Sequence, residues 1–261
     1  MFDSIHRQNG AVALTQEQIT QYFDKGYLVL PPLFSAEEMR AIDEAFQRLL
    51  KVASTLKETQ MVGGAKFVVE EKTVNRVVWC GALESELLQL SADARLLTVV
   101  GQLLESETME QLICQAHFKL PGDGVHFRWH QDSENRRFGT PEWEDLNGKG
   151  SFVQTVMAVD PATLENAPLM VAEASHLLGH LGLDKTRDTE KRVDSSKMIP
   201  LLMSPGDVLL MHPFLVHGSR PNRSKVSRRV FINGYSYPGA NRRTYPGEGA
   251  GRLLSAKSAA K

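Results

Sequence analysis

The sequence predicts an α+β fold in which helices from the first half of the chain pack on a β-rich second half. Capped amphipathic segments dominate up to about residue 105, and from about residue 109 short apolar runs alternate with Gly, Pro, Asn and Asp. Many short strands with such turn residues are typical of a jelly roll or barrel. The 261 residues are 42% hydrophobic and show no compositional boundary, so one domain over residues 1–261 is expected.

Helices are expected at three places in the first half. The segment TQEQITQYFD opens on Thr15 as a possible N-cap and should end near Gly26. Ser35 and Glu38 form a capping box before MRAIDEAFQRLL. Ser91 is expected to cap a helix through ADARLLTVVGQLLE. The apolar runs between these segments are predicted strands: YLVL, which two prolines cut off, KFVVEE and VNRVVW.

Strands are expected throughout the second half, where the apolar runs are short and rich in β-branched and aromatic residues. In DVLLMHPFLVHGS one strand is expected to deliver His217 to a turn at Gly218 and Ser219, which places His212 on the opposite side of that strand. The other expected strands are MEQLICQAHFKL, SFVQTVMAV, PLMVAEA, MIPLLMS and RRVFINGYSY.

The charge balance argues against several classes of protein. Lysine and arginine number 30 against 31 acidic residues, so no global field would attract nucleic acid or an anionic membrane. No signal peptide and no run of eighteen apolar residues is visible, which predicts a soluble cytoplasmic protein. Cys80 and Cys114 are too few for a disulfide framework and are expected to be buried thiols. Residues 1–14 and 255–261 are expected to be mobile.

The motif RWHQDSEN is a candidate metal site. His130 and Asp132 are two residues apart, so on a strand both would project from one face toward one ion. His217, at the end of a predicted strand, is the candidate third ligand. Two histidines and one carboxylate leave coordination positions open, as in non-haem Fe(II) oxygenases, although the same ligands also suit zinc or manganese.

Arg228 points to a second ligand at the same site. It follows His217 by eleven positions on the next predicted strand, where a buried guanidinium could bind a carboxylate in a fork. Arg229 comes directly after it, so one of the two must face away. A cosubstrate with one carboxylate for the arginine and a chelating 2-oxo acid for the metal would use both features, and 2-oxoglutarate has that form.

Together with their surroundings these residues resemble the phytanoyl-CoA dioxygenase family of Fe(II)/2-oxoglutarate-dependent oxygenases, which includes the ectoine hydroxylases. The resemblance runs from LTQEQITQYFDKGYLVLPPLFSAEEM through WHQD and ENAPLMVAEASH to SPGDVLLMHPFLVHGSRPNRSKVSRR. It implies a double-stranded β-helix, the jelly roll of cupins, with helices packed on one sheet. It also implies a site that uses Fe(II), 2-oxoglutarate and molecular oxygen. The family's metal triad falls on His130, Asp132 and His217.

The resemblance also assigns residues to the cosubstrate. The carboxylate-binding arginine of the family falls on Arg228, Ser219 matches a second contact to the same carboxylate, and Lys119 stands where relatives place a lysine near the cosubstrate. Halogenating relatives lack the carboxylate that is present here as Asp132, which favours a hydroxylase or desaturase over a halogenase. The segment ENAPLMVAEASH departs from the usual family pattern in a loop that borders the substrate.

The expected function is hydroxylation of an unactivated C–H bond in a small-molecule metabolite, with release of succinate and carbon dioxide. One alternative is a cupin-like zinc or manganese hydrolase or isomerase that uses the same triad without 2-oxoglutarate. A second is a metal-free binding module, against which the intact triad argues. The polar segment ENRRFGTPEW is a candidate lid or substrate loop, and its Arg136 and Arg137 either meet an acidic substrate or are solvated.

Overall fold

A computed structural model describes residues 6–8, 11–70, 72–182, 193–244 and 251–256. Its α-helices are α1 (Gln16–Lys25), α2 (Ala36–Ala53), α3 (Ser85–Leu90), α4 (Ala94–Leu104) and α5 (Asp132–Arg136). Short 3-10 helices lie at Cys80–Ala82, Ser175–Leu178 and Ser195–Lys197. Within these described ranges, no helix combines the length and the apolar composition needed to cross a membrane.

Two antiparallel sheets and a hairpin contain the strands. The large sheet has the order β3-β12-β9-β14-β7-β6-β5-β4, and β15 also pairs with β7. Its strands are β3 (Tyr27–Leu30), β4 (Gln60–Val62), β5 (Ala65–Glu70), β6 (Thr73–Val78), β7 (Thr108–Lys119), β9 (Phe152–Ala158), β12 (Val208–Met211), β14 (Arg228–Ser236) and β15 (Arg252–Ser255). The small sheet, in the order β11-β10-β13-β8, has β8 (Phe127–His130), β10 (Met170–Val171), β11 (Ile199–Pro200) and β13 (His217–Ser219). The hairpin is β1 (His6–Gln8) with β2 (Ala11–Ala13).

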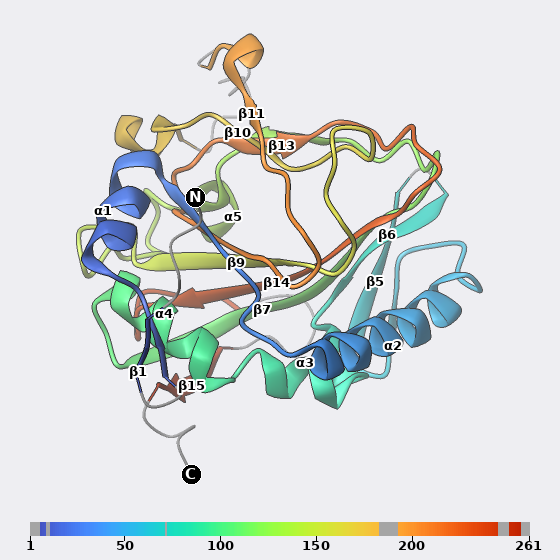
Figure 1. Ribbon diagram of the computed structural model, residues 1–261, viewed down its shortest axis with the longest axis horizontal. Coiled ribbons are helices and arrows are strands. Elements are labelled where there is room, and N and C mark those ends of the chain that lie inside the picture. The colour runs from blue at the N-terminus through green and yellow to red at the C-terminus, as the bar shows by residue number, and fades with distance from the viewer. Residues whose placement is uncertain (1–5, 9–10, 71, 183–192, 245–250, 257–261) are drawn as a thin grey trace.

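The large sheet lies between two other layers. In Figure 1, α2, α3 and α4 run along one of its faces, and the small sheet lies over the other. Side chains alternate along β14: Phe231 packs against Phe46 of α2, with ring centroids 6.4 Å apart, whereas Val230 and Ile232 face the space between the sheets. One hydrophobic core therefore lies under the helices, and a second lies between the two sheets.

Local capping positions the first two helices as predicted. The side chains of Thr15 and Ser35 cap α1 and α2, each in a reciprocal capping box. α1 ends at Gly26, whose φ of 85° lies in the left-handed region that glycine tolerates best. These caps satisfy backbone N–H groups at the start of each helix through contacts within one turn.

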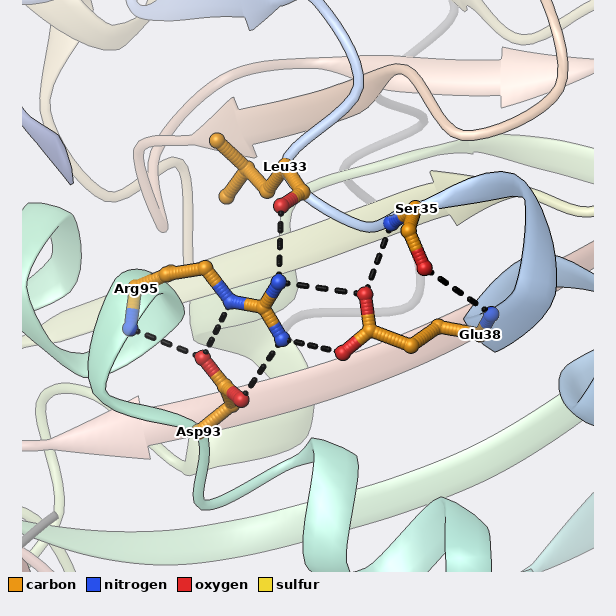
Figure 2. A network of polar contacts seen from close by, with 5 residues as sticks. All are labelled: Leu33, Ser35, Glu38, Asp93 and Arg95. Carbon is orange, nitrogen blue, oxygen red and sulfur yellow. Dashed lines mark hydrogen bonds and ion pairs between the residues drawn. The ribbon is translucent and has the colours of Figure 1, made fainter. Parts of the chain in front are cut away.

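A charged network at the start of α4 corrects the prediction for Ser91. Ser91 follows α3, and its hydroxyl donates to the Leu88 carbonyl at 2.8 Å. Asp93 caps α4 instead, because its carboxylate accepts from the backbone N–H of Arg95 at 2.9 Å. Figure 2 shows the Arg95 guanidinium between the carboxylates of Asp93 and Glu38, so that the network joins α4 to α2. The hydrogen bonds from Arg95 lower the pKa of Glu38 to about 2.

The segment DVLLMHPFLVHGS forms two strands, so the prediction of one strand was wrong. β12 ends at Met211 in the large sheet, and β13 begins at His217 in the small sheet. Pro213 lies between them and has no N–H to donate to a ladder. The connection turns at His212, whose carbonyl accepts from the Leu215 N–H at 3.0 Å. The chain thus crosses from one sheet to the other, and His212 does not lie on a regular strand.

Parts of the two ends that were expected to be mobile are packed in the structure. Leu14 is buried, and its N–H donates to the side chain of Gln102 on α4 at 2.7 Å. Ser255 closes β15, which pairs with β7. Residues 1–5, 9–10 and 257–261 of the expected mobile ends lie outside the described residues.

Candidate metal centre and its cavity

His130 and His217 face each other across two neighbouring strands of the small sheet. β8 and β13 pair with these residues in register, and the two ring centroids are 4.3 Å apart. Gly218 permits this close approach, because a Cβ there would lie 2.5 Å from the ring of Trp129 and 2.8 Å from the carbonyl of Phe127. The tight strand pair therefore fixes the positions of both imidazoles.

Asp132 reaches the two histidines from a helix, and the prediction that it shares a strand with His130 was wrong. β8 ends at His130, and Asp132 is the first residue of α5. Gln131 fixes the turn between them: its buried side chain donates to the carbonyls of Gly179 at 2.9 Å and Phe214 at 2.6 Å. Sequence reasoning missed Gln131, because on a regular strand the residue between two ligands points away from them.

These three side chains bring ligand atoms within reach of one ion. One N or O atom each of His130, Asp132 and His217 lies within 4.8 Å of the other two. Each histidine donates its Nδ1–H to the carbonyl two residues earlier, Arg128 at 2.7 Å and Leu215 at 2.9 Å, which leaves the Nε2 lone pair free. Asp132 Oδ2 is buried with no hydrogen-bond partner in the described part of the chain, so the residues present fit a divalent cation.

The surroundings keep His217 in the neutral form. Burial, together with the neighbouring His130, lowers the pKa of His217 to about 4, although Asp132 opposes this shift from 3.9 Å away. Neutral imidazole is the form that binds metals. Two imidazoles and one carboxylate suit Fe(II), zinc and manganese alike, so the ligands alone do not select the metal.

A cavity of about 440 Å³ lies between the sheets and is lined by all three of these side chains. Arg228 of β14 also lines it, is buried, and has no hydrogen-bond partner for its Nε among the described residues. Burial lowers the pKa of Arg228 to about 10, which still leaves the guanidinium charged at neutral pH. Arg229 points to the other face of the sheet and pairs with Asp160 and Asp43. The structure therefore places Arg228, and not Arg229, on the cavity wall.

Ser219 and Lys119 differ in their relation to this cavity. Ser219 ends β13, lines the cavity and is buried, so the turn expected at this position is part of a strand. Lys119 is not among the lining residues: its buried amine donates to the carbonyls of Val125, at 2.8 Å, and Arg220. These contacts join the segment before β8 to the segment after β13. Burial lowers the pKa of Lys119 to about 7.

Several polar side chains on the cavity wall were not assigned to the site from the sequence, which favoured a structural role for His117 over a place in the pocket. His117 of β7 stacks on Phe127 with ring centroids 5.5 Å apart, and it bonds to Gln115 at 2.8 Å. Burial lowers the pKa of His117 well below its usual value. The sequence signal is a polar residue at an inward position of an apolar strand, such as Gln154 in SFVQTVMAV. The other missed polar residues are Lys66, Arg76, Asn135 and Arg243.

The segment ENRRFGTPEW contributes one of its two arginines to the cavity. Arg136, the last residue of α5, is 6% exposed, lines the cavity and stacks its guanidinium 5.1 Å from the ring centroid of Phe152. Arg137 is exposed and pairs with Glu142 at 3.1 Å. Arg137 is therefore solvated, whereas Arg136 is buried on the cavity wall.

Curated proteins with related sequences are oxygenases. The chain is 25% identical over 224 residues to the methylphosphonate hydroxylase of Gimesia maris, an alignment that covers 85% of this chain and 81% of the relative. It is 28% identical over 231 residues to an ectoine dioxygenase of Sphingopyxis alaskensis, with coverage of 79% and 71%.

Solved structures share the fold. EctD from S. alaskensis with 2-oxoglutarate and 5-hydroxyectoine matches with a TM-score of 0.70 at 23% identity, covering 94% of this chain and 89% of EctD. SnoK, a non-heme alpha ketoglutarate dependent carbocyclase from nogalamycin biosynthesis, matches with a TM-score of 0.69 at 17% identity, covering 93% and 97%. The family model of phytanoyl-CoA dioxygenase matches residues 22–230, which is most of the sequence, and the chain belongs to that family.

Proposed function

We propose that this protein is a non-haem Fe(II)- and 2-oxoglutarate-dependent dioxygenase that hydroxylates an unactivated C–H bond of a small-molecule metabolite. One observation carries the proposal: a single cavity holds His130, Asp132 and His217 together with the buried guanidinium of Arg228. Membership of the phytanoyl-CoA dioxygenase family supports it. The two facing antiparallel sheets support a double-stranded β-helix, or jelly roll, as the core.

The iron is assigned to His130, Asp132 and His217. Both imidazoles present Nε2 because their Nδ1–H groups are already bonded to carbonyls, and the unsatisfied Asp132 Oδ2 supports a cation at this point. Asp132 also takes the coordination position that a halide would need, which favours hydroxylation over halogenation.

The distal carboxylate of 2-oxoglutarate is assigned to Arg228, with the hydroxyl of Ser219 as a second donor. A buried cation without a partner is unfavourable, and a carboxylate bound in a fork would relieve that cost. A zinc or manganese hydrolase built on the same triad has no use for Arg228. This residue therefore favours the oxygenase over that alternative.

Bound Fe(II) and 2-oxoglutarate would supply the oxidation, in which molecular oxygen converts the cosubstrate to succinate and carbon dioxide and hydroxylates the substrate. The chain itself holds and orients these groups. Apolar side chains from the large sheet, among them Val156, Val230 and Ile232, line the cavity beside the polar residues and limit the access of water. The relatives named for methylphosphonate and ectoine support a small polar molecule as substrate.

Calorimetric titration of 2-oxoglutarate into Fe(II)-loaded protein without oxygen tests the proposal. We expect 2-oxoglutarate to bind at least about tenfold tighter than succinate, which lacks the 2-oxo group and cannot chelate. His217→Ala should remove this advantage. If the metal binds but 2-oxoglutarate binds no tighter than succinate, the cosubstrate assignment is wrong and the zinc or manganese alternative replaces it.

A further inference from the structure

One part of the cavity wall, on β5, β6 and β7, has no role in the proposed binding of iron and 2-oxoglutarate. Lys66 of β5, Val78 of β6 and Gln115 of β7 line this part of the cavity. They lie side by side on one face of the large sheet, because Lys66 and Gln115 each pair in register with Val78. The two long polar side chains can therefore reach over the shorter valine toward one ligand group.

The ammonium group of Lys66 has no carboxylate to neutralise it. Lys66 is half-buried, and within the described ranges its amine makes no hydrogen bond or ion pair. Arg76, which lines the cavity from the neighbouring strand, differs because it pairs with Glu70 at 3.1 Å. Asp132 is the one carboxylate among the described lining residues, and it is assigned to the metal. A lysine ammonium has three N–H donors and no acceptor, so it can bind only an acceptor group.

Gln115 presents a second donor to the cavity, because His117 holds its amide oxygen. Burial and nearby basic side chains lower the pKa of His117 well below its usual value, so the ring is neutral. Its Nε2–H donates to Gln115 Oε1 at 2.8 Å. The amide nitrogen of Gln115 has no partner in the part of the chain that the structure describes, and it is left to donate into the cavity.

Gln115 lies close to the strand that carries a metal ligand. Its partner His117 stacks on Phe127 of β8, with ring centroids 5.5 Å apart. The same strand ends at His130. A group bound by Gln115 and Lys66 would thus leave the rest of a small molecule beside the metal centre.

Lys66 and Arg228 lie in different parts of the cavity. Arg228 pairs with Lys119, four residues along β7 from Gln115. In the sheet order, β14 is three strands away from β5. At about 4.8 Å per strand and about 3.4 Å per residue, the backbones at Lys66 and Arg228 are roughly 20 Å apart. The cavity of about 440 Å³ between them can hold a small molecule beside the cosubstrate.

We propose that Lys66 and Gln115 bind an anionic group of the substrate, so that the substrate is a small molecule with a carboxylate or a phosphonate. The inference rests on the proposed function, since it treats Arg228 as the arginine of the cosubstrate. Both side chains present N–H donors to the cavity, which favours an oxyanion over an ammonium group. The bound anion would orient the substrate with its C–H bond toward the metal centre.

Calorimetric titration tests this assignment with three probes: butyrate, methylphosphonate and the neutral butyramide. Each probe is added without oxygen to Fe(II)-loaded protein saturated with 2-oxoglutarate, so that Arg228 is already occupied. We expect at least one anion to bind, and butyramide to bind at least about tenfold more weakly than that anion. The two anions distinguish a carboxylate site from a phosphonate site.

Variants at both residues separate a direct contact from a general effect of charge. Lys66→Gln should lower the affinity for the anion by at least about tenfold, because a charge-assisted hydrogen bond is lost. Gln115→Glu gives Lys66 a carboxylate from within the chain and should have a similar effect. Lys66→Arg keeps the charge and should bind the anion more tightly than Lys66→Gln. Lys57→Gln is the matched control, since it removes the same charge from an exposed residue that does not line the cavity.

The Lys66 variants should retain the 2-oxoglutarate affinity of wild type, which shows that the site is folded. No anion binding to wild type, or equal anion binding in wild type and Lys66→Gln, would overturn the assignment. An equal loss in Lys57→Gln would also overturn it, and an unchanged affinity in Gln115→Glu would remove Gln115 from the site. Each of these results leaves the oxygenase intact, whereas no binding of 2-oxoglutarate to wild type would refute the proposed function itself.

Discussion

Arg228 and Arg229 are consecutive residues of β14, yet they lie in two contrasting regions of the molecule. Arg229 lies on the helix-covered face, where it pairs with Asp160 at 2.6 Å and with Asp43 of α2 at 2.7 Å. Arg228 lies on the cavity face, where its Nε has no partner among the described residues. An arginine side chain thus belongs to an ion-pair network on one face of the sheet and lines the cavity on the other face.

The pKa values of the two arginines express this difference. Burial lowers the pKa of Arg228 to about 10. Burial also acts on Arg229, but the hydrogen bonds and charges of Asp160 and Asp43 outweigh it and raise the pKa. Arg229 in turn holds the pKa of Asp160 below its usual value, although burial of that carboxyl opposes the shift. Removing one member of a buried ion pair is costly because the other charge is left uncompensated. The Nε of Arg228 has no partner among the described residues and can take a ligand.

The largest expected effect is on cosubstrate binding in Arg228→Gln. Removing the guanidinium should lower the affinity for 2-oxoglutarate by about 500-fold, because a buried bidentate pair of hydrogen bonds to its carboxylate is lost. Arg229→Gln removes the same charge from the same strand and should change the affinity by no more than about threefold, since its face does not meet the cavity. Calorimetry on Fe(II)-loaded proteins without oxygen measures the affinity of both variants. A similar loss of affinity in the two would contradict the assignment of Arg228, and not Arg229, to the cosubstrate.

Protein stability should show the reverse order. Arg229→Gln leaves the mostly buried Asp160 without its ion-pair partner, although the Ser227 hydroxyl and the backbone N–H of residue 229 still donate to it, and should lower the free energy of unfolding by about 3 kcal/mol. Arg228→Gln removes a buried charge whose Nε has no partner in the described part of the chain, so the metal-free protein should lose no stability and should gain some. Urea denaturation of the metal-free proteins gives both values. A stability loss in Arg228→Gln as large as that in Arg229→Gln would show that the cavity arginine has a structural partner.

Like Arg228, His212 is buried with a lowered pKa, and this makes the stability of the protein depend on pH. Burial, with a contribution from His176, lowers the pKa of His212 from 6.5 to about 3. Between these values the unfolded chain binds a proton that the folded protein does not, so stability falls as the pH is lowered through this window. The slope from one such group is up to about 1.4 kcal/mol per pH unit. His212→Gln should reduce the slope by that amount, measured by urea denaturation between pH 6 and pH 5, and an unchanged slope would mean that His212 is protonated in the fold.

The smallest effect is expected at the network in Figure 2. Arg95 is partly exposed, with 27% of its side chain accessible, and it bonds to Asp93 and Glu38 at the starts of α4 and α2. Solvent screening limits such pairs, so Arg95→Gln should lower the free energy of unfolding by about 1 kcal/mol. Urea denaturation checks the value. A loss as large as that of Arg229→Gln would show that exposure does not weaken ion pairs in this fold.

Local signals were enough to predict much of the fold. The caps at Thr15 and Ser35 act within one helical turn, and the structure confirms both helices. The alternating and apolar runs of the second half predicted the main strands, because side-chain period and turn residues are local properties. The cap expected at Ser91 lies two residues later, at Asp93, which accepts from the Arg95 N–H, while the guanidinium of Arg95 also reaches Glu38 of α2.

The positions of several side chains at the site depend on tertiary contacts, which the sequence did not predict. Asp132 lies on a helix because Gln131 is fixed by backbone carbonyls from two distant segments, which no local pattern reveals. The side chain of Lys119 ends on two carbonyls, whereas Arg228, its partner in the β7–β14 register, lines the cavity. Arg136 is buried against Phe152, whereas its neighbour Arg137 is exposed and pairs with Glu142. The spacing of the candidate ligands could be read from the sequence. The contacts around each side chain involve residues far apart in the sequence, so the sequence did not predict them.

The central claim is that one cavity binds iron and 2-oxoglutarate together. Its most direct test is visible spectroscopy without oxygen: Fe(II) and then 2-oxoglutarate are added to metal-free protein, and the metal-to-ligand charge-transfer band is recorded. We expect the band in wild type and none in His217→Ala or when zinc replaces iron. If Fe(II) binds to wild type and no band forms with 2-oxoglutarate, the cosubstrate does not chelate the metal and the account of this site is wrong.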